Sequence, residues 1–324
     1  MAAQVVTDAD FIAAWAMSGS PEAVAKATGL GVRGVYRRRD SLAKRGVRLE
    51  TRADNASAEW GDKGWTYPRE RKVQIPDGSI VVSSDHHYWP GQPSVAHRAL
   101  IEVIGRVKPR VKVVNGDIFD GVSICRHPPF GWGDRPKVKD ELSACVDRLG
   151  EIEAACDVSK TKCELLWNIG NHDIRFERTL AMQAKDFEGL QFFRLSDHFP
   201  LWEMQWSCLV NPDAPHPVMI KHRYAGGVHA AYNNTMKGGL SIVTGHTHLL
   251  EVKPWGDYRG RRWGVQTGTL ADHHGPQFEY VENSPSAACS GFAVLTFHNG
   301  RMIPPELCEV IDGKAWFRGE VVAQ

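Results

Sequence analysis

The feature that most constrains the fold of this chain is a series of short apolar runs, each followed by a side chain able to bind a metal ion. These side chains recur in one order along the sequence: Asp85, His87, Asp117, Asn171, His222, His246 and His248. Open α/β sheets carry their sites at the carboxyl ends of their strands, so we expect these residues to meet there. The pattern predicts an α/β fold with a polar site at the strand ends.

Strand and helix patterns alternate through the middle of the chain. The runs typical of buried strands are 79–85, 110–117 and 163–171, and the amphipathic helical patterns are 94–107 and 138–156. Later segments read as strands joined by turns without long helices: 249–255, 258–270 and 291–302. The alternating part predicts a sheet with helices on its faces, and the later part predicts a second sheet packed on the first.

Short motifs surround the metal-type residues, in the order D-x-H, GD, GNHD, H and GHTH. The ordered set resembles the calcineurin-like metallophosphoesterase superfamily over roughly residues 79–248. This resemblance implies a four-layer αββα sandwich, in which two packed sheets are flanked by helices, and a hydrolase acting on phosphoesters. The segment 268–280 is similar to phage and prophage members of the superfamily, which are compared with SbcD-type nucleases.

The resemblance also implies two divalent metal ions. It assigns Asp85, His87 and His248 to the first ion, Asn171, His222 and His246 to the second, and Asp117 to both. Carboxylate, imidazole and carboxamide ligands suit manganese, the metal expected here, and also iron, zinc, magnesium, nickel or cobalt. His222 ends the apolar run 217–221 as the family's strand residue does, with His229 as its rival.

Residue spacing supports this ligand set. His246 and His248 are two positions apart, and on an extended chain such side chains share a face, so both can point into one site. Asp85 and His87 have the same spacing, and His86 between them is expected to point away from the site.

Several polar residues near the ligands are candidates for contact with a phosphate. In the family His172 contacts the phosphate and can act as a general acid, and Asp173 is expected to orient its ring and raise its pKa. Arg126, His127 and Arg175 are candidates to hold a phosphate oxygen, the alternative being solvated surface residues. Asp120 is either an acceptor for a ligand histidine or a plain turn residue. His273 and His274 are expected not to be ligands.

The first 52 residues predict a separate helical domain. Helical patterns within 8–46 end in a basic third helix that carries Arg33, Arg37, Arg38 and Arg39. This pattern is typical of a helix-turn-helix module and resembles those of terminase- and resolvase-type proteins. The alternative is a packing or dimerising unit with solvated arginines. A linker is expected over 53–78 and a catalytic domain over 79–324.

Bulk properties narrow the classes of partner. The net charge is +1, so any affinity for nucleic acid must come from a local patch. No apolar run reaches the ~18 residues needed to cross a bilayer, and we expect no membrane partner and no signal peptide. The seven scattered cysteines contain no CxxC pair and favour reduced thiols in a cytoplasm, that of the host if a phage encodes the chain. A homodimer is one arrangement that a helix-turn-helix module allows.

We expect a phosphodiesterase or nuclease that acts on DNA in preference to RNA, with the N-terminal module delivering it to the substrate. Two alternatives stay open. One is a phosphomonoesterase acting on nucleotides or nucleic-acid ends, and the other is a DNA-binding accessory protein with a vestigial site. The complete set of seven ligands argues against the vestigial site.

Overall fold

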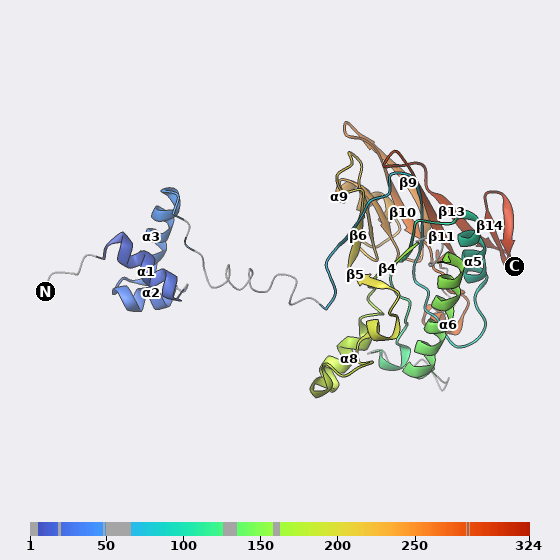
Figure 1. Cartoon of the computed structure of the whole chain (residues 1–324), viewed down its shortest axis with the longest axis horizontal. Helices are drawn as coiled ribbons and strands as arrows, with labels where there is room; N and C mark the ends of the chain where they lie inside the picture. Colours follow the sequence, from blue (N-terminus) through green and yellow to red (C-terminus); the bar gives the residue numbers. More distant parts are fainter. Residues whose placement is uncertain are drawn as a thin grey trace. The chain divides into compact units, whose positions relative to one another are not determined.

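The structure is a computed structural model of the chain, and it divides into two compact units, Met1–Thr66 and Tyr67–Gln324 (Figure 1). It describes residues 6–18, 21–47, 49, 66–125, 135–157, 163–282, 284 and 286–324. Each unit is treated by itself. Among the described residues, none of the helices is long and apolar enough to cross a membrane.

The N-terminal unit is helical, with α1 (Asp8–Ser18), α2 (Pro21–Thr28) and α3 (Val32–Lys44). Its core is an apolar cluster formed by Phe11, Trp15, Val24, Val35 and Leu42. A three-residue turn separates α2 from α3, and Gly29 in this turn has a left-handed φ of +69°. The helices lie where the apolar spacing predicts them, and the turn length is that of a helix-turn-helix.

Helix α1 begins with a side-chain cap. Thr7 is the capping residue, because its Oγ1 accepts a hydrogen bond from the backbone nitrogen of Asp10 at 3.1 Å. In turn, the Asp10 carboxylate accepts a hydrogen bond from the Thr7 backbone nitrogen at 3.2 Å. Asp10 thus takes the third helical position of a capping box, and Asp8 instead pairs with Arg38 and Arg45.

The larger sheet of the second unit has the strand order β15-β14-β13-β11-β2-β3-β4-β5, and β12 pairs with β11. Its strands are β2 (Gly78–Ser83), β3 (Val111–Val114), β4 (Glu164–Asn168), β5 (Glu203–Gln205), β11 (Gly291–His298), β12 (Arg301–Met302), β13 (Glu306–Ile311), β14 (Lys314–Phe317) and β15 (Glu320–Ala323). The central strands β2, β3, β4 and β5 run parallel.

The smaller sheet has the order β1-β6-β7-β8-β10-β9. Its strands are β1 (Arg71–Val73), β6 (Ser207–Val210), β7 (Val218–Lys221), β8 (Ser241–Thr244), β9 (Leu250–Asp257) and β10 (Gly260–Thr267). Strand β1 pairs in parallel with β6, so residues 71–73, within the segment expected as a linker, belong to this sheet. Strands β7 and β8 are parallel neighbours.

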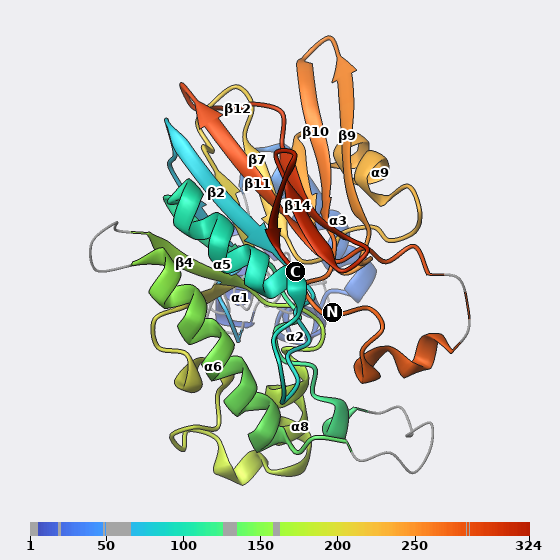
Figure 2. The same cartoon turned by 90° about the vertical axis from the view of Figure 1, so that its right-hand side faces the viewer.

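The two sheets pack face to face with helices outside them, as Figure 2 shows. Along β2, Ile80 and Val82 face the smaller sheet, and Val81 faces α5 (Val95–Val107) and α6 (Val138–Cys156). Helix α9 (Ala230–Gly238) covers the far side of the smaller sheet through β8, β9 and β10. This arrangement confirms the expected four-layer αββα sandwich.

One helical insertion lies between β4 and β5, which are neighbouring strands of the larger sheet. Helix α8 (Arg175–Gln183) starts directly after the turn that follows β4, and short helical turns continue to His198 before β5. Helix α8 therefore begins beside the carboxyl end of the larger sheet, where the site described below lies.

Candidate metal centre

The predicted ligands follow strand ends in both sheets. Asp85, Asp117 and Asn171 come after the parallel neighbours β2, β3 and β4, and His222 and His246 come after the parallel neighbours β7 and β8. Two of the three groups of possible ligands among the described residues combine residues from the two sheets, so the strand ends of both sheets converge at one place. The third group is His87, Asp120 and His172. The fold thus brings together residues that are far apart in the sequence.

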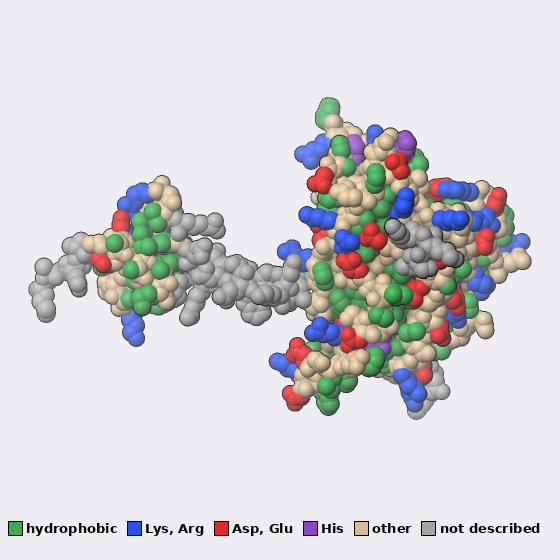
Figure 3. Space-filling view, viewed as in Figure 1, with side chains coloured by type: hydrophobic (Ala, Val, Ile, Leu, Met, Phe, Trp, Pro, Cys, Tyr) green, Lys and Arg blue, Asp and Glu red, His purple; other side chains and the backbone are tan. Residues whose placement is uncertain are grey.

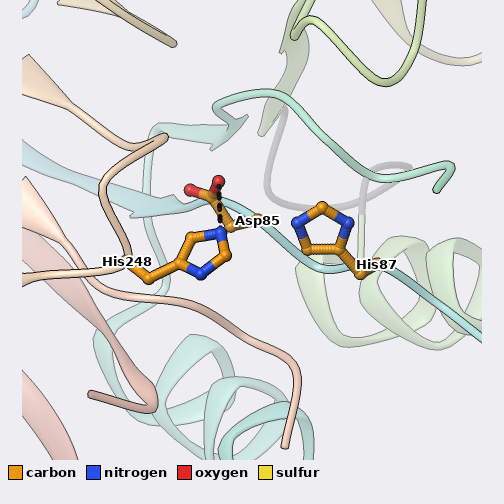
Figure 4. A group of neighbouring side chains, drawn as sticks. All are labelled: Asp85, His87 and His248. Carbon is orange, nitrogen blue, oxygen red and sulfur yellow. Dashed lines mark ion pairs between the residues drawn. The ribbon is translucent and has the colours of Figure 1, made fainter. Parts of the chain in front are cut away.

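Asp85, His87 and His248 form the first group, with one ligand atom from each within 4.8 Å of the others (Figure 4). The Oδ1 atom of Asp85 lies 3.2 Å from the Nε2 atom of His248. Burial alone would raise the pKa of Asp85, but the adjoining His248 lowers it overall, so this side chain is a buried carboxylate. Two imidazoles and a carboxylate in this arrangement suit a divalent cation.

Asp117, His222 and His246 form the second group. The Nε2 atom of His222 lies 3.1 Å from Oδ2 of Asp117 and 3.3 Å from Oδ1 of Asn171. The Nδ1 atom of His222 lies 2.8 Å from the carbonyl oxygen of Asn115 and donates to it, which leaves Nε2 for the centre. The rival His229 is an exposed residue at the start of α9.

The backbone at this centre is in an uncommon conformation. Five of the seven predicted ligands have a positive φ: Asp85 (52°), His87 (41°), Asp117 (55°), His246 (69°) and His248 (58°). For residues other than glycine this left-handed region is sparsely populated, and residues held there gather at functional sites. The strand ends are therefore shaped to aim these side chains at a shared place.

Three glycines give the ligands room. A Cβ atom on Gly170 would lie 2.1 Å from Oδ1 of Asp117, and one on Gly245 would lie 2.6 Å from Oδ2 of Asp85. A Cβ on Gly116 would lie 2.3 Å from Nδ1 of His222. Any side chain at these positions would displace a predicted ligand, because real Cβ atoms do not approach other heavy atoms so closely.

The centre has the electrostatic properties of a cation site. Among the described residues, the buried Nε2 atom of His87 has no hydrogen-bond partner, and leaving such a group unpaired costs roughly 1–3 kcal/mol. Burial alone would lower the pKa of His222, but the Asp117 carboxylate raises it to about 10. The donor set and the negative potential therefore fit divalent metal ions held by nitrogen and oxygen ligands.

His172 lies beside this centre, and Asp120 holds its ring. The Nδ1 atom of His172 lies 2.7 Å from Oδ1 of Asp120, and its backbone nitrogen donates to Oδ1 of Asp117 at 2.8 Å. The Nη2 group of Arg175 donates to Nε2 of His172 at 3.0 Å. Burial lowers the pKa of His172, but Asp117 and Asp120 raise it above its usual value overall.

Asp173, expected to orient His172, is bonded elsewhere. Its carboxylate accepts backbone hydrogen bonds from Asp117 at 2.9 Å and from Gly170 at 2.8 Å, and a side-chain bond from Trp167 at 3.0 Å. It joins the turn after β3 to the turn after β4. The ring of His172 is instead held by Asp120, and this difference arises because the turn directs the neighbouring side chain into the core.

Asp120 connects His172 to the first group of ligands. Its Oδ1 atom also lies 3.1 Å from Nδ1 of His87. One carboxylate therefore fixes the rings of a predicted ligand and of the predicted acid together, and both Nε2 atoms are left for other partners. Asp120 was expected to be either an acceptor for a ligand histidine or a plain turn residue. In the structure it is the acceptor, because its carboxylate faces His87.

Glu141 on α6 was not singled out in the sequence. It is buried, and its carboxylate accepts the backbone N–H groups of Gly121 at 2.7 Å and Val122 at 3.2 Å, which fixes the loop that carries Asp120. One feature of the sequence could have identified Glu141: it stands next to Leu142 on the apolar face of a helix. An acid at such a position normally has a specific partner.

The remaining predicted residues fall into three groups. Arg126 and His127 lie outside the described residues. His86 is buried and turns to Oγ of Ser83 at 2.9 Å, away from both groups of ligands, as expected. His273 lies outside the metal-type groups found among the described residues, and it lines a cavity next to them.

That cavity has a volume of about 470 Å³ and is bounded on one side by His246 and His248. Its other walls include Val228, Leu249 and Phe278. The ring centroid of Phe278 lies 5.3 Å from that of His248, so an apolar wall stands directly against the candidate metal centre.

The predicted nucleic-acid-binding arginines of α3 divide into two pairs. Arg33 and Arg37 are exposed and lie about one turn apart on one face of α3. Figure 3 shows the basic side chains of the molecule in blue. Arg38 is half-buried and pairs with Asp8 at 2.8 Å, and Arg39 lies over the rings of Trp15 and Tyr36. Arg33 and Arg37 therefore offer their charge to solvent, whereas Arg38 and Arg39 contribute to packing.

Comparisons with known proteins give limited matches. No family model matches the sequence. A stretch of 111 residues is 32% identical to the Gene 54 protein of Mycobacterium phage L5, and one of 112 residues is 32% identical to the Gene 54 protein of Mycobacterium phage D29. Each match covers 31% of this chain and 42% of the phage protein, so the chain spans less than half of these relatives.

A solved structure of a dimetal phosphatase from Danio rerio is similar to this chain at 9% sequence identity and a TM-score of 0.34. The similarity covers 76% of this chain and 99% of that one.

Proposed function

We propose that the Tyr67–Gln324 unit hydrolyses phosphoesters with two divalent metal ions, manganese being the expected metal. The observation that carries the proposal is the pair of adjoining ligand groups, built from buried carboxylates and imidazoles at the strand ends of two sheets. Paired divalent ions are suited to in-line displacement at phosphorus, because they stabilise both the attacking and the leaving oxygen. The order of the D-x-H, GD, GNHD and GHTH motifs supports the same activity.

In this proposal each group of ligands holds one ion. Asp85, His87 and His248 would hold the first, Asn171, His222 and His246 would hold the second, and Asp117 would be shared. When bound, such ions supply Lewis acidity toward the phosphoryl oxygens and water of lowered pKa. The protein contributes a rigid frame, since the glycines and the left-handed turns fix the ligand directions.

His172 is proposed to give a proton to the leaving oxygen. Its Nδ1–H is donated to Asp120, which leaves Nε2 as the atom that faces the centre, 4.0 Å from Oδ2 of Asp117. In the structure Arg175 donates a hydrogen bond to this Nε2 atom. A phosphoryl oxygen placed between Arg175 and His172 would replace that contact. With Nε2 protonated, as the raised pKa of His172 favours, this oxygen would receive a hydrogen bond from each side chain, and the Nε2 proton is the one given to the leaving oxygen.

Turnover of bis-para-nitrophenyl phosphate and of para-nitrophenyl phosphate with added Mn²⁺ tests the activity. Asp117→Asn should lower the rate by orders of magnitude, because it removes the charge proposed to lie between two cations. Asp147→Asn is the matched control, since Asp147 is exposed on α6. Full activity in a folded Asp117→Asn variant, shown by an unchanged circular dichroism spectrum, would contradict the proposal.

The finer proposal is that the substrate is DNA and that the N-terminal unit delivers the hydrolase to it. Arg33 and Arg37 support this, because they leave two exposed cations on α3, the helix that a helix-turn-helix places against DNA. Cleavage of single- or double-stranded DNA with added Mn²⁺, lost in the Asp117→Asn variant, would support a nuclease. Intact DNA with turnover of the monoester would favour the phosphomonoesterase instead.

A further inference from the structure

The cavity beside the candidate metal centre is lined by histidines on one side and carries apolar side chains elsewhere. His246 and His248 form one side, and Leu249, Phe278 and Val281 contribute apolar side chains to the others. Phe278 is 7% exposed, and its ring centroid lies 5.8 Å from that of His87. A group bound in the cavity would therefore touch both the apolar wall and the metal-type histidines.

The described lining carries no Lys, Arg, Asp or Glu. The histidine on the outer side, His273, is neutral at pH 7, because burial and the neighbouring His274 lower its pKa. Oxygen and nitrogen atoms are present, in Thr247, in Ser286 and in the backbone of Gly226 and Gly227. A pocket that combines apolar side chains with polar groups, and has no Lys, Arg, Asp or Glu in its described lining, is suited to a neutral organic group.

The size of the cavity restricts its occupant. Its volume of about 470 Å³ equals that of a cube about 8 Å on a side, whereas the major groove of duplex DNA alone is about 12 Å wide. The cavity is too small to enclose a duplex, but it has room for one base with its sugar. Apolar and aromatic side chains are suited to a nucleobase, and packing of a base on an aromatic ring contributes about 1–3 kcal/mol.

We propose that this cavity seats a single nucleoside, the substituent of the phosphate that the metal centre hydrolyses. This inference rests on the proposed function and deepens it, since it names a nucleoside phosphoester as the substrate. The phosphate would lie at the histidines, and the base would pack against Phe278 and Leu249. We take the substrate to be a strand end or a free nucleotide, because a nucleotide stacked inside a duplex would have to be flipped out to reach such a cavity.

The first test measures binding without turnover. Thymidine and adenosine, which carry no phosphate, are titrated calorimetrically into the full chain, with 2-deoxyribose as the comparison. We expect both nucleosides to bind and the sugar not to bind. Phe278→Ala should weaken the binding at least tenfold, whereas Tyr258→Ala, on a fully exposed aromatic residue, should leave it unchanged.

A second variant keeps this test decisive if the loss of Phe278 unfolds the protein. Val228 is 72% exposed and lines the cavity, so Val228→Trp can fill the space without disturbing the core. We expect Val228→Trp to melt at the wild-type temperature and to bind nucleosides at least tenfold more weakly. Wild-type binding in either folded variant, or no binding of nucleosides to the wild type, would overturn the proposal.

The substrate arm compares thymidine monophosphate, a linear single strand, the same strand with an abasic terminal residue, and a closed circular strand. Release of phosphate from thymidine monophosphate would support the nucleoside pocket with a free nucleotide as the substrate. Cleavage of the linear strand, but not of the abasic or circular strand, would support the pocket with a strand end as the substrate. Equal cleavage of linear and circular strands would overturn it. If nucleosides bind but no ester is hydrolysed, the hydrolase proposal fails and the pocket stands.

Discussion

Asp120 holds two imidazole rings with one carboxylate oxygen, and this gives it more influence on the centre than its position in a turn suggests. Its Oδ1 atom lies 3.1 Å from Nδ1 of His87 and 2.7 Å from Nδ1 of His172. Residues that orient metal ligands from behind typically change metal affinity or activity 10- to 100-fold when they are replaced. Asp120 is therefore a positioning residue for both the first ligand group and the proposed acid.

Asp120→Ala should lower turnover by roughly 10- to 100-fold, because both rings lose the partner that fixes them. The loss should be larger for an alkyl phosphoester than for a para-nitrophenyl ester, since a poor leaving group depends more on a general acid. Parallel kinetics on the two esters measure this difference. An equal loss on both would mean that Asp120 does not act through His172.

Lys112 is a buried residue with no role in the proposed chemistry. It lies on β3 with no exposed surface, and its Nζ donates to Oγ of Ser83 and to the carbonyl oxygen of Val113. Burial lowers its pKa from 10.5 to about 7. The unfolded chain therefore binds a proton between pH 7 and 10.5 that the folded chain does not bind, and the free energy of unfolding rises with pH through this range.

Lys112→Met should remove this pH dependence. The wild type should gain on the order of 4 kcal/mol of stability from Lys112 between pH 7 and pH 10, at about 1.4 kcal/mol per pKa unit, and the variant should not. Urea unfolding of both proteins at the two pH values measures the difference. The same rise in both proteins would show that Lys112 is charged and satisfied in the fold.

At the scale of the elements, the strands and helices of the sandwich follow from apolar periodicity, and the strand ends follow from where each apolar run stops. The two-residue spacing of His246 and His248 does not predict the directions of their side chains. Both have positive φ, so the chain there is not extended, and the two rings join different ligand groups. Spacing predicts which residues are near the site, but a left-handed turn decides where each side chain points.

Other features could not be predicted because they depend on contacts between distant segments. Glu141 meets Gly121 only when α6 packs beside the loop after β3, and Asp173 joins two turns that separate strands bring together. The cap at Thr7 is a local feature, and the box formed by Thr7 and Asp10 is visible in the sequence once both residues are considered.

The contact of α9 with the smaller sheet depends on one glycine. A Cβ atom on Gly264 would lie 1.9 Å from the carbonyl oxygen of Ala231 in α9. Gly264→Ala should destabilise the fold by roughly 1–3 kcal/mol or more, because the helix must move away from β10. Thermal unfolding measures the loss, with Gly256→Ala as the control, since a Cβ on Gly256 in the adjacent strand meets nothing within 4 Å. Equal stability of the two variants would contradict this packing.

At the scale of the whole molecule, the division into two units suggests that the proposed binding of DNA and the proposed hydrolysis can be separated. If Arg33 and Arg37 contact phosphates, replacing both with Ala should reduce the slope of log K against log salt by about two, at about 0.9 per phosphate contact. Turnover of a small ester should not change. Fluorescence anisotropy with labelled DNA measures the slope, and Lys26→Ala, on the exposed side of α2, is a control. An unchanged slope in the double variant would assign DNA binding elsewhere.

The central claim is that the strand ends of the two sheets form two adjoining cation sites. Titration of the metal-free protein with Mn²⁺, read by calorimetry and by elemental analysis, tests it most directly. We predict two ions per chain for the wild type and one each for His248→Ala and His222→Ala, because each variant removes a ligand of one group only. Binding of no ion, or of two ions by both folded variants, would contradict the account.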